Sequence, residues 1–174
     1  EELETSKEEL QSVNEELITV NSELQAKIEQ LAGMQNDMKN LLDNTHIGTV
    51  FRDQRLIIRG FRRDATTIYR LVPTDVGRPL SDIKSNIAGE ALLTQAHTVL
   101  ETLIPFEQEV RTDNGIWYLV RIQPYRTLDN VIDGVVLTFT DISKRIKAET
   151  DMQLTRDLAE SVVDTIDKPL LVMD

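Results

Sequence analysis

The sequence predicts an α+β fold: a five-stranded antiparallel sheet with helices on one face, preceded by a long coiled-coil helix and followed by an exit helix. Three observations support this prediction. A seven-residue repeat fills residues 1–42, strand-like runs alternate with turn signals over residues 43–141, and helical periodicity returns over residues 142–168. We interpret these parts as a coiled-coil linker, a sheet domain and an exit helix.

The repeat in residues 1–42 has no proline, one glycine, and a leucine or methionine at every seventh place. This column takes heptad position a, because the other register has fewer apolar partners. The repeat favours a parallel coiled coil between two copies of the chain; a lone amphipathic helix on a globular core is the alternative. The predicted dimer seam is Leu3, Leu10, Val13, Leu17, Val20, Leu24, Ile28 and Leu31.

Charges in this register agree with a parallel pair. Glutamates occupy the g positions, and the e positions that they face include Asn14 and Asn21. Opposing acids therefore do not meet across the seam.

Five runs in residues 43–141 have the apolar, β-branched and aromatic residues typical of strands: 48–53, 55–61, 106–112, 116–126 and 133–140. The first two are close enough to form a hairpin, and the Asp-Asn-Gly sequence at 113–115 predicts a tight turn. Along the fourth run, Tyr118 and Val120 share one face while Trp117 and Leu119 share the other, and either face could point inward.

Two helices are predicted between the second and third runs. Residues 62–71 read as a short helix with Asp64 as its cap. Residues 88–103 place apolar side chains at 92, 96, 99 and 103 on one helical face, and Pro105 follows.

Residues 142–168 form the predicted exit helix, whose first amides Asp141 or Ser143 can cap. The apolar residues of 169–174 suggest the first strand of a following domain. We therefore expect the sequence to be a segment of a longer protein.

Composition excludes several classes of function. The chain has no cysteine, which excludes disulfides, thiolate metal sites and a cysteinyl-flavin adduct. No apolar run is long enough to span a bilayer, and no targeting signal is visible, so we expect a cytoplasmic protein. The net charge of −11 lies mainly in the two ends, which argues against binding to nucleic acid.

Several stretches resemble a known family. "LLDNTHIGTVFRDQRLIIRGF" and "IPFEQEVRTDNGIWYLVRIQPYRTLDNVIDGVVLTFTDISKRIKAE" are similar to a PAS domain, with "TDIS" at the junction between its last strand and its exit helix. The opening repeat, "LVPTDVGRPLSDI" and "WYLVRIQPYRT" resemble the PAS segment of chemotaxis-type methylesterase and methyltransferase fusion proteins, which often precede a histidine kinase. One departure is Arg62 and Arg63, where relatives have a proline-bearing turn.

The resemblance implies a sensory module whose signal junction is Asp141, Ile142 and Ser143. Residues 169–174 would then begin a second PAS-like domain. Neither a methyltransferase cofactor loop nor a phosphoacceptor histidine is present, so catalysis is expected in other parts of the parent protein and not in this segment.

A sheet covered by helices can also enclose a small molecule. The candidate ligand pocket is lined by Ile47, Val50, Leu92, Val99, Val120, Ile122 and Leu137, although these residues could equally fill a core. His97 lies on the helix that supplies a haem ligand in some PAS domains, but at the edge of its apolar arc. We therefore expect neither haem nor flavin, and no metal.

An arginine-rich stretch is the last candidate feature. Its guanidinium groups could bind an anionic ligand, but solvation or docking beside the acidic helices is the favoured interpretation. The stretch comprises Arg52, Arg55, Arg59, Arg62, Arg63, Arg70 and Arg78.

Overall fold

The computed structural model describes residues 1–87 and 89–167. The chain divides into two units, Glu1–Thr45 and the part that begins at His46. The predicted strand start at 169–174 lies outside the described residues.

The first unit is a single helix, α1 (Glu2–Thr45), which extends three residues beyond the predicted range. His46 ends it by adopting a positive φ of 51°. No residue of α1 is buried. All of the predicted seam residues are exposed, from Val20 at 48% to Leu3 at 88%.

The second unit is built on a five-stranded antiparallel sheet with the order β2-β1-β5-β4-β3. Its strands are β1 (Gly48–Arg52), β2 (Ile58–Phe61), β3 (Phe106–Arg111), β4 (Trp117–Arg126) and β5 (Ile132–Asp141). The predicted α+β class, with its five strands, long first helix and exit helix, is confirmed. The first and last strands of the sheet domain are neighbours, because β1 pairs with β5.

The turn between β1 and β2 is longer than the predicted hairpin. Asp53 Oδ1 accepts hydrogen bonds from the backbone N–H groups of Arg55 and Ile57, at 2.9 and 2.8 Å. Such Asx geometry competes with strand pairing. As a result β2 begins at Ile58, three residues after the start of the predicted run.

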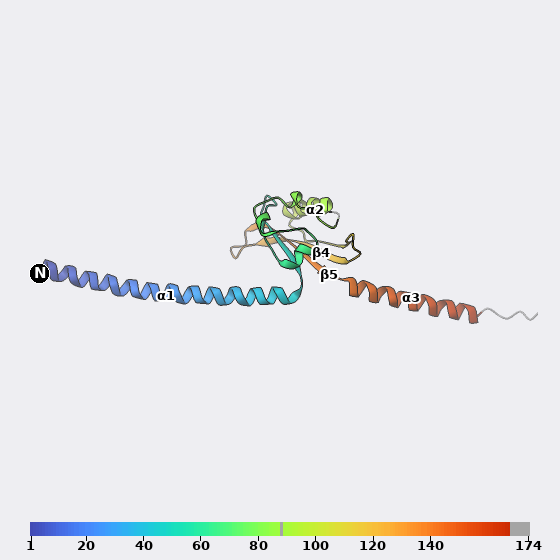
Figure 1. Ribbon diagram of the computed structural model, residues 1–174, viewed down its shortest axis with the longest axis horizontal. Helices are drawn as coiled ribbons and strands as arrows, with labels where there is room; N and C mark the ends of the chain where they lie inside the picture. Colours follow the sequence, from blue (N-terminus) through green and yellow to red (C-terminus); the bar gives the residue numbers. More distant parts are fainter. Residues whose placement is uncertain (88, 168–174) are drawn as a thin grey trace, which may run out of the picture. The chain divides into compact units, whose positions relative to one another are not determined.

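Helices cover one face of the sheet, and Figure 1 shows α2 on that face. They are the 3₁₀ helices η1 (Arg63–Thr67), η2 (Pro73–Asp75) and η3 (Leu80–Asp82), and the α-helix α2 (Gly89–Thr102). The expected helix over 62–71 is only the short η1, and Asp64 lies inside its first turn and does not cap it. The hydroxyls of Thr66 and Thr67 donate to carbonyls three residues back, which suits this tighter helix.

Helix α2 packs through the predicted face only in part. Leu92, Ala96 and Val99 are buried, whereas Leu103 follows the end of the helix with a φ of 59° and is partly exposed. The helix therefore contributes three buried side chains to the core, and the partly buried Leu93 and Leu100 also pack against it.

Strand alternation determines which face of the sheet is inward. Tyr118, Val120 and Ile122 of β4 are buried in the core, while Trp117 and Leu119 lie on the more accessible face. Val135, Leu137 and Phe139 of β5 alternate in the same way.

Two glycines differ sharply in their surroundings. Gly134 has a φ of +147°, and a Cβ there would lie 1.8 Å from the backbone oxygen of Arg52. Gly33 on α1 has no heavy atom within 4 Å of the same position. Close approach of β1 to β5 therefore requires glycine at 134.

Candidate functional site

The junction between β5 and helix α3 (Ser143–Ile166) brings together the three residues that the sequence singles out. Asp141 Oδ1 accepts a 2.8 Å hydrogen bond from the N–H of Ser143. The N–H of Trp117 donates to Ser143 Oγ at 3.1 Å, and the N–H of Ile142 donates to the Trp117 carbonyl at 2.9 Å. The first residues of α3 are thus bonded to the start of β4.

Two side chains reinforce this attachment. Ile142 is 7% exposed and occupies the N-cap position of α3. Its side chain makes no capping hydrogen bond, and the carboxylate of Asp141 accepts from the next amide, that of Ser143. Arg145 forms an ion pair with Glu109 of β3, and this hydrogen bond raises the pKa of Arg145 above its usual value. The sequence alone did not indicate Arg145, because its partner lies 36 residues away.

The guanidinium of Arg52 is a second polar feature, and it lies in the interior between the sheet and its helices. Arg52 is 2% exposed and points to the same face as Val50. Its Nε and Nη2 donate to the carbonyl oxygen of Leu56 at 2.9 and 2.5 Å, and Nη1 is buried with no partner in the part of the chain that the structure describes. Burial lowers the pKa of Arg52 to about 10, while Tyr69 and Asp53 act in the opposite direction.

Among the described residues, the hydroxyl of Tyr69 is likewise buried without a hydrogen-bond partner. Its ring meets that of Phe139 edge-on, with centroids 5.8 Å apart. Burial raises the pKa of Tyr69 to about 12, and Arg52 opposes this shift. Leaving such a group unpaired costs about 1–3 kcal/mol. The Arg52 guanidinium and the Tyr69 hydroxyl therefore each lower the stability of the fold.

The predicted ligand-pocket residues lie around this interior. Six of the seven belong to one apolar core cluster, and Ile47 is half-buried outside it. They pack against one another in the way that the core alternative expects, and their contact with a ligand stays a prediction.

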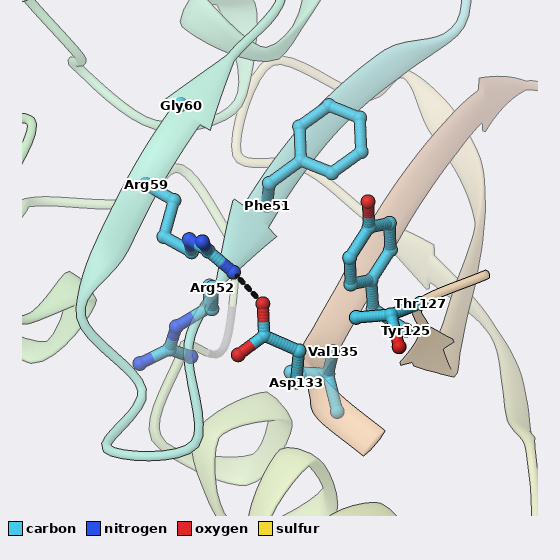
Figure 2. A pocket seen from close by; sticks show the side chains of 8 residues that line it. All are labelled: Phe51, Arg52, Arg59, Gly60, Tyr125, Thr127, Asp133 and Val135. Carbon is cyan, nitrogen blue, oxygen red and sulfur yellow. Dashed lines mark hydrogen bonds and ion pairs between the residues drawn. The ribbon is translucent and has the colours of Figure 1, made fainter. Parts of the chain in front are cut away.

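A cavity of about 270 Å³ opens on the opposite face of the sheet (Figure 2). The rings of Phe51 and Tyr125 meet edge-on, with centroids 6.4 Å apart, and Arg59 pairs with Asp133 beside them. This pair raises the pKa of Arg59. The lining residues are Phe51, Arg52, Arg59, Gly60, Tyr125, Thr127, Asp133 and Val135.

The arginine-rich stretch does not act as one group. Arg52 is buried, and Arg59 has its acidic partner on β5. Arg78 donates to the buried carboxylate of Asp75 at 2.9 Å, and that carboxylate also accepts from the N–H of Val72. These three arginines thus have contacts within the sheet unit, and docking of the stretch beside the acidic helices stays a prediction.

Both histidines, His46 and His97, are exposed. Within residues 1–87 and 89–167, no three histidine or acidic side chains are grouped so that they could hold a metal ion. The same residues include no helix with the length and apolar content to cross a membrane.

Known proteins give the following matches. A protein from Rhodobacter capsulatus, named as an uncharacterized 104.1 kDa protein in the hypE 3' region, is 36% identical over 150 residues. These residues are 86% of this chain, which spans only 15% of that protein.

Solved structures give further matches. VqmA of Vibrio cholerae bound to DPO has a TM-score of 0.50 at 16% identity, over 60% of this chain and 56% of that one. The PAS domain of the histidine kinase ThkA has a TM-score of 0.48 at 20% identity, over 55% of this chain and 98% of that domain.

The family model described as PAS domain matches residues 38–143, which include the whole sheet, the helices that cover it and the junction residues. More than half of the chain lies within this match. The chain therefore belongs to the PAS domain family.

Proposed function

We propose that this chain is a dimeric relay module: it transmits a change in its PAS sheet to α3, and two copies associate through a parallel coiled coil of α1. The observation that carries this proposal is the bonding of Ser143 and Ile142 to Trp117. Because α3 begins on hydrogen bonds to β4, a shift of that strand changes the position of the first helical turn.

A second contact also joins α3 to the sheet. Arg145 links the first turn of α3 to Glu109 on the edge strand β3. A displacement of β4 relative to β5 therefore alters the hydrogen bonds to Trp117, and a displacement of β3 alters the ion pair of Arg145. Two helices leaving a dimer can convert such a displacement into a change of helix packing.

The apolar stripe of α1 supports the dimer. Leu17 and Leu24 are each 55% exposed, although they occupy the a positions of the heptad repeat. Covering such a stripe contributes about 25 cal/mol for each Å² of apolar surface removed from water. Glutamate at g and asparagine at e favour a parallel, in-register pair, because no two acidic side chains then face each other.

We place this relay beside the catalytic domains of a chemotaxis-type methyltransferase or a histidine kinase. The motifs that resemble the methylesterase and methyltransferase fusion proteins support this placement. Catalysis would belong to those domains, because no described cluster of side chains in this chain provides a catalytic set.

Disulfide cross-linking tests the parallel dimer, since the chain has no native cysteine. Leu17→Cys places one thiol at position a, where two parallel copies meet, and we expect a covalent dimer on mild oxidation. Ser22→Cys, at the outward f position, is the matched control and should form no covalent dimer under the same conditions. Equal cross-linking of both variants, or of neither, would refute the register.

A further inference from the structure

The cavity of Figure 2 combines two aromatic rings with one ion pair. The rings of Phe51 and Tyr125 border it, and the pair of Arg59 and Asp133 lies beside them. The cavity opens away from the core, because Phe51 alternates with the buried Val50 along β1. Its volume of about 270 Å³ is close to the lower limit for small-molecule sites, about 300 Å³.

Gly60 leaves this cavity open on the side of β2. It lies opposite Phe51 in the strand register, so a side chain at 60 would share the face of Phe51. Gly60 has no positive φ, and a Cβ there would meet no heavy atom within 4 Å. Neither the backbone conformation nor packing within the chain therefore requires glycine. Glycine weakens a strand interior and often marks a place where a ligand approaches closely.

The ion pair presents a donor and an acceptor side by side. Nη1 of Arg59 donates to Oδ2 of Asp133. Nη1 carries a second N–H, and Oδ2 has further lone pairs. Neither atom has another hydrogen-bond partner among the described residues. The two side chains are 49% and 40% exposed, so a ligand in the cavity can contact both.

We propose that this cavity binds a planar, uncharged heterocycle with a lactam edge, on which an N–H lies next to a C=O. The lactam N–H donates to Oδ2 of Asp133, and the lactam C=O accepts from Nη1 of Arg59. The ring stacks on one of the two aromatic side chains and meets the other edge-on, which are the arrangements that aromatic pairs prefer.

The charges of the pair select against ionised ligands. A carboxylate attracted to Arg59 would be repelled by Asp133, and an ammonium attracted to Asp133 would be repelled by Arg59. A lactam forms a hydrogen bond with each partner and adds no charge. Since exposed polar contacts contribute little, ring stacking supplies much of the affinity, and we expect weak binding.

This inference goes beyond the relay function and does not depend on it. The lining residues all lie within the sheet unit of one copy, so a monomeric protein would retain the site. Loss of the dimer and loss of ligand binding are therefore separate outcomes.

Titration of the full chain with uracil, followed by amide chemical shifts in nuclear magnetic resonance spectra, tests the site. We expect saturable shifts at Phe51, Gly60 and Tyr125 with a Kd of about 1 mM. The control ligand is 1,3-dimethyluracil, in which methyl groups replace both N–H donors. This control, benzoate and benzylamine should each bind about tenfold more weakly or less.

Three variants test the assigned contacts. Gly60→Val fills the cavity from β2 and should still fold, because the position is open and valine suits a strand. Gly60→Val, Tyr125→Leu and Arg59→Met should each weaken uracil binding by about tenfold or more. Arg121→Met is the matched control, since Arg121 and Glu107 form an ion pair of similar exposure, 50% and 54%, outside the cavity. It should leave binding unchanged.

Three results would overturn the proposal. The first is equal binding of uracil and 1,3-dimethyluracil, and the second is wild-type affinity in Gly60→Val. The third is the absence of saturable shifts up to about 10 mM uracil. Shifts centred on core residues such as Leu92 and Ile122 would place the ligand in the interior and would equally contradict the site.

Discussion

Helix α1 and the PAS unit use their apolar residues in opposite ways. On α1 the leucines and valines of the repeat are all about half exposed or more, whereas Val50, Leu137 and Phe139 of the sheet are fully buried. The helix has a strict repeat and no core, and the sheet unit has a core and no repeat. We infer that the repeat encodes a surface for a second chain, and that the irregular alternation encodes an interior.

The largest expected effect comes from the interior. Phe139→Ala removes a fully buried ring that packs on Tyr69, and it should lower the free energy of unfolding of the sheet unit by about 3–5 kcal/mol. Urea unfolding followed by near-UV circular dichroism measures this loss. Tyr125→Ala, at a 40% exposed aromatic residue, is the control and should cost much less. Similar losses from both would mean that Phe139 is not part of a packed core.

Next in size is a change in the α1 seam. Leu17→Asp places a charge at position a and should raise the dimer dissociation constant by about 100-fold, or about 2.7 kcal/mol. Ile18→Asp is a closely matched control, because Ile18 is 59% exposed against 55% for Leu17 but lies outside the seam. Sedimentation equilibrium should separate the two variants. If they behave alike, exposure and not register determines association.

The junction should respond more weakly. Ser143→Ala removes the oxygen that accepts the Trp117 N–H and should destabilise the attachment of α3 by about 1 kcal/mol. Amide hydrogen exchange should become faster at Trp117 and in the first turn of α3. Thr150→Ala, which loses a hydroxyl bond to Ile146 further along the same helix, should leave Trp117 unaffected. Unchanged exchange at Trp117 in Ser143→Ala would argue against the coupling.

The smallest effect concerns charge on the seam. Asn14→Glu combined with Asn21→Glu places acids opposite the g-position glutamates and should weaken the dimer by about 0.5–1 kcal/mol at low salt. The effect should shrink at high salt because screening shortens the range of the repulsion. Ser12→Glu with Thr19→Glu adds the same charge at c positions and should have less effect. A salt dependence common to both pairs would contradict the assigned register.

Local patterns were enough to predict much of this fold. The heptad repeat predicted α1, and runs of apolar, β-branched and aromatic residues between turn signals predicted all five strands, because both signals depend on neighbours within a few residues. The junction residues 141–143 were also predicted, from a motif at the end of a strand. Their role in signalling stays a prediction.

Other features depend on contacts that no local pattern contains. Arg145 meets Glu109 across 36 residues, and Trp117 meets Ser143 across 26. Arg52 is more instructive, since its spacing from Val50 places both on the inward face of β1. Strand periodicity could have indicated its burial, but the usual preference of arginine for the surface argued the other way.

The contrast between Gly134 and Gly33 predicts different tolerance of substitution at the two positions. In a library of single variants, substitutions at 134 should be depleted, because any side chain there would collide with the Arg52 carbonyl oxygen. At 33 the helix surface is open, and replacement by alanine should even improve helix propensity by up to about 1 kcal/mol. The two glycines thus differ in how many substitutions they tolerate.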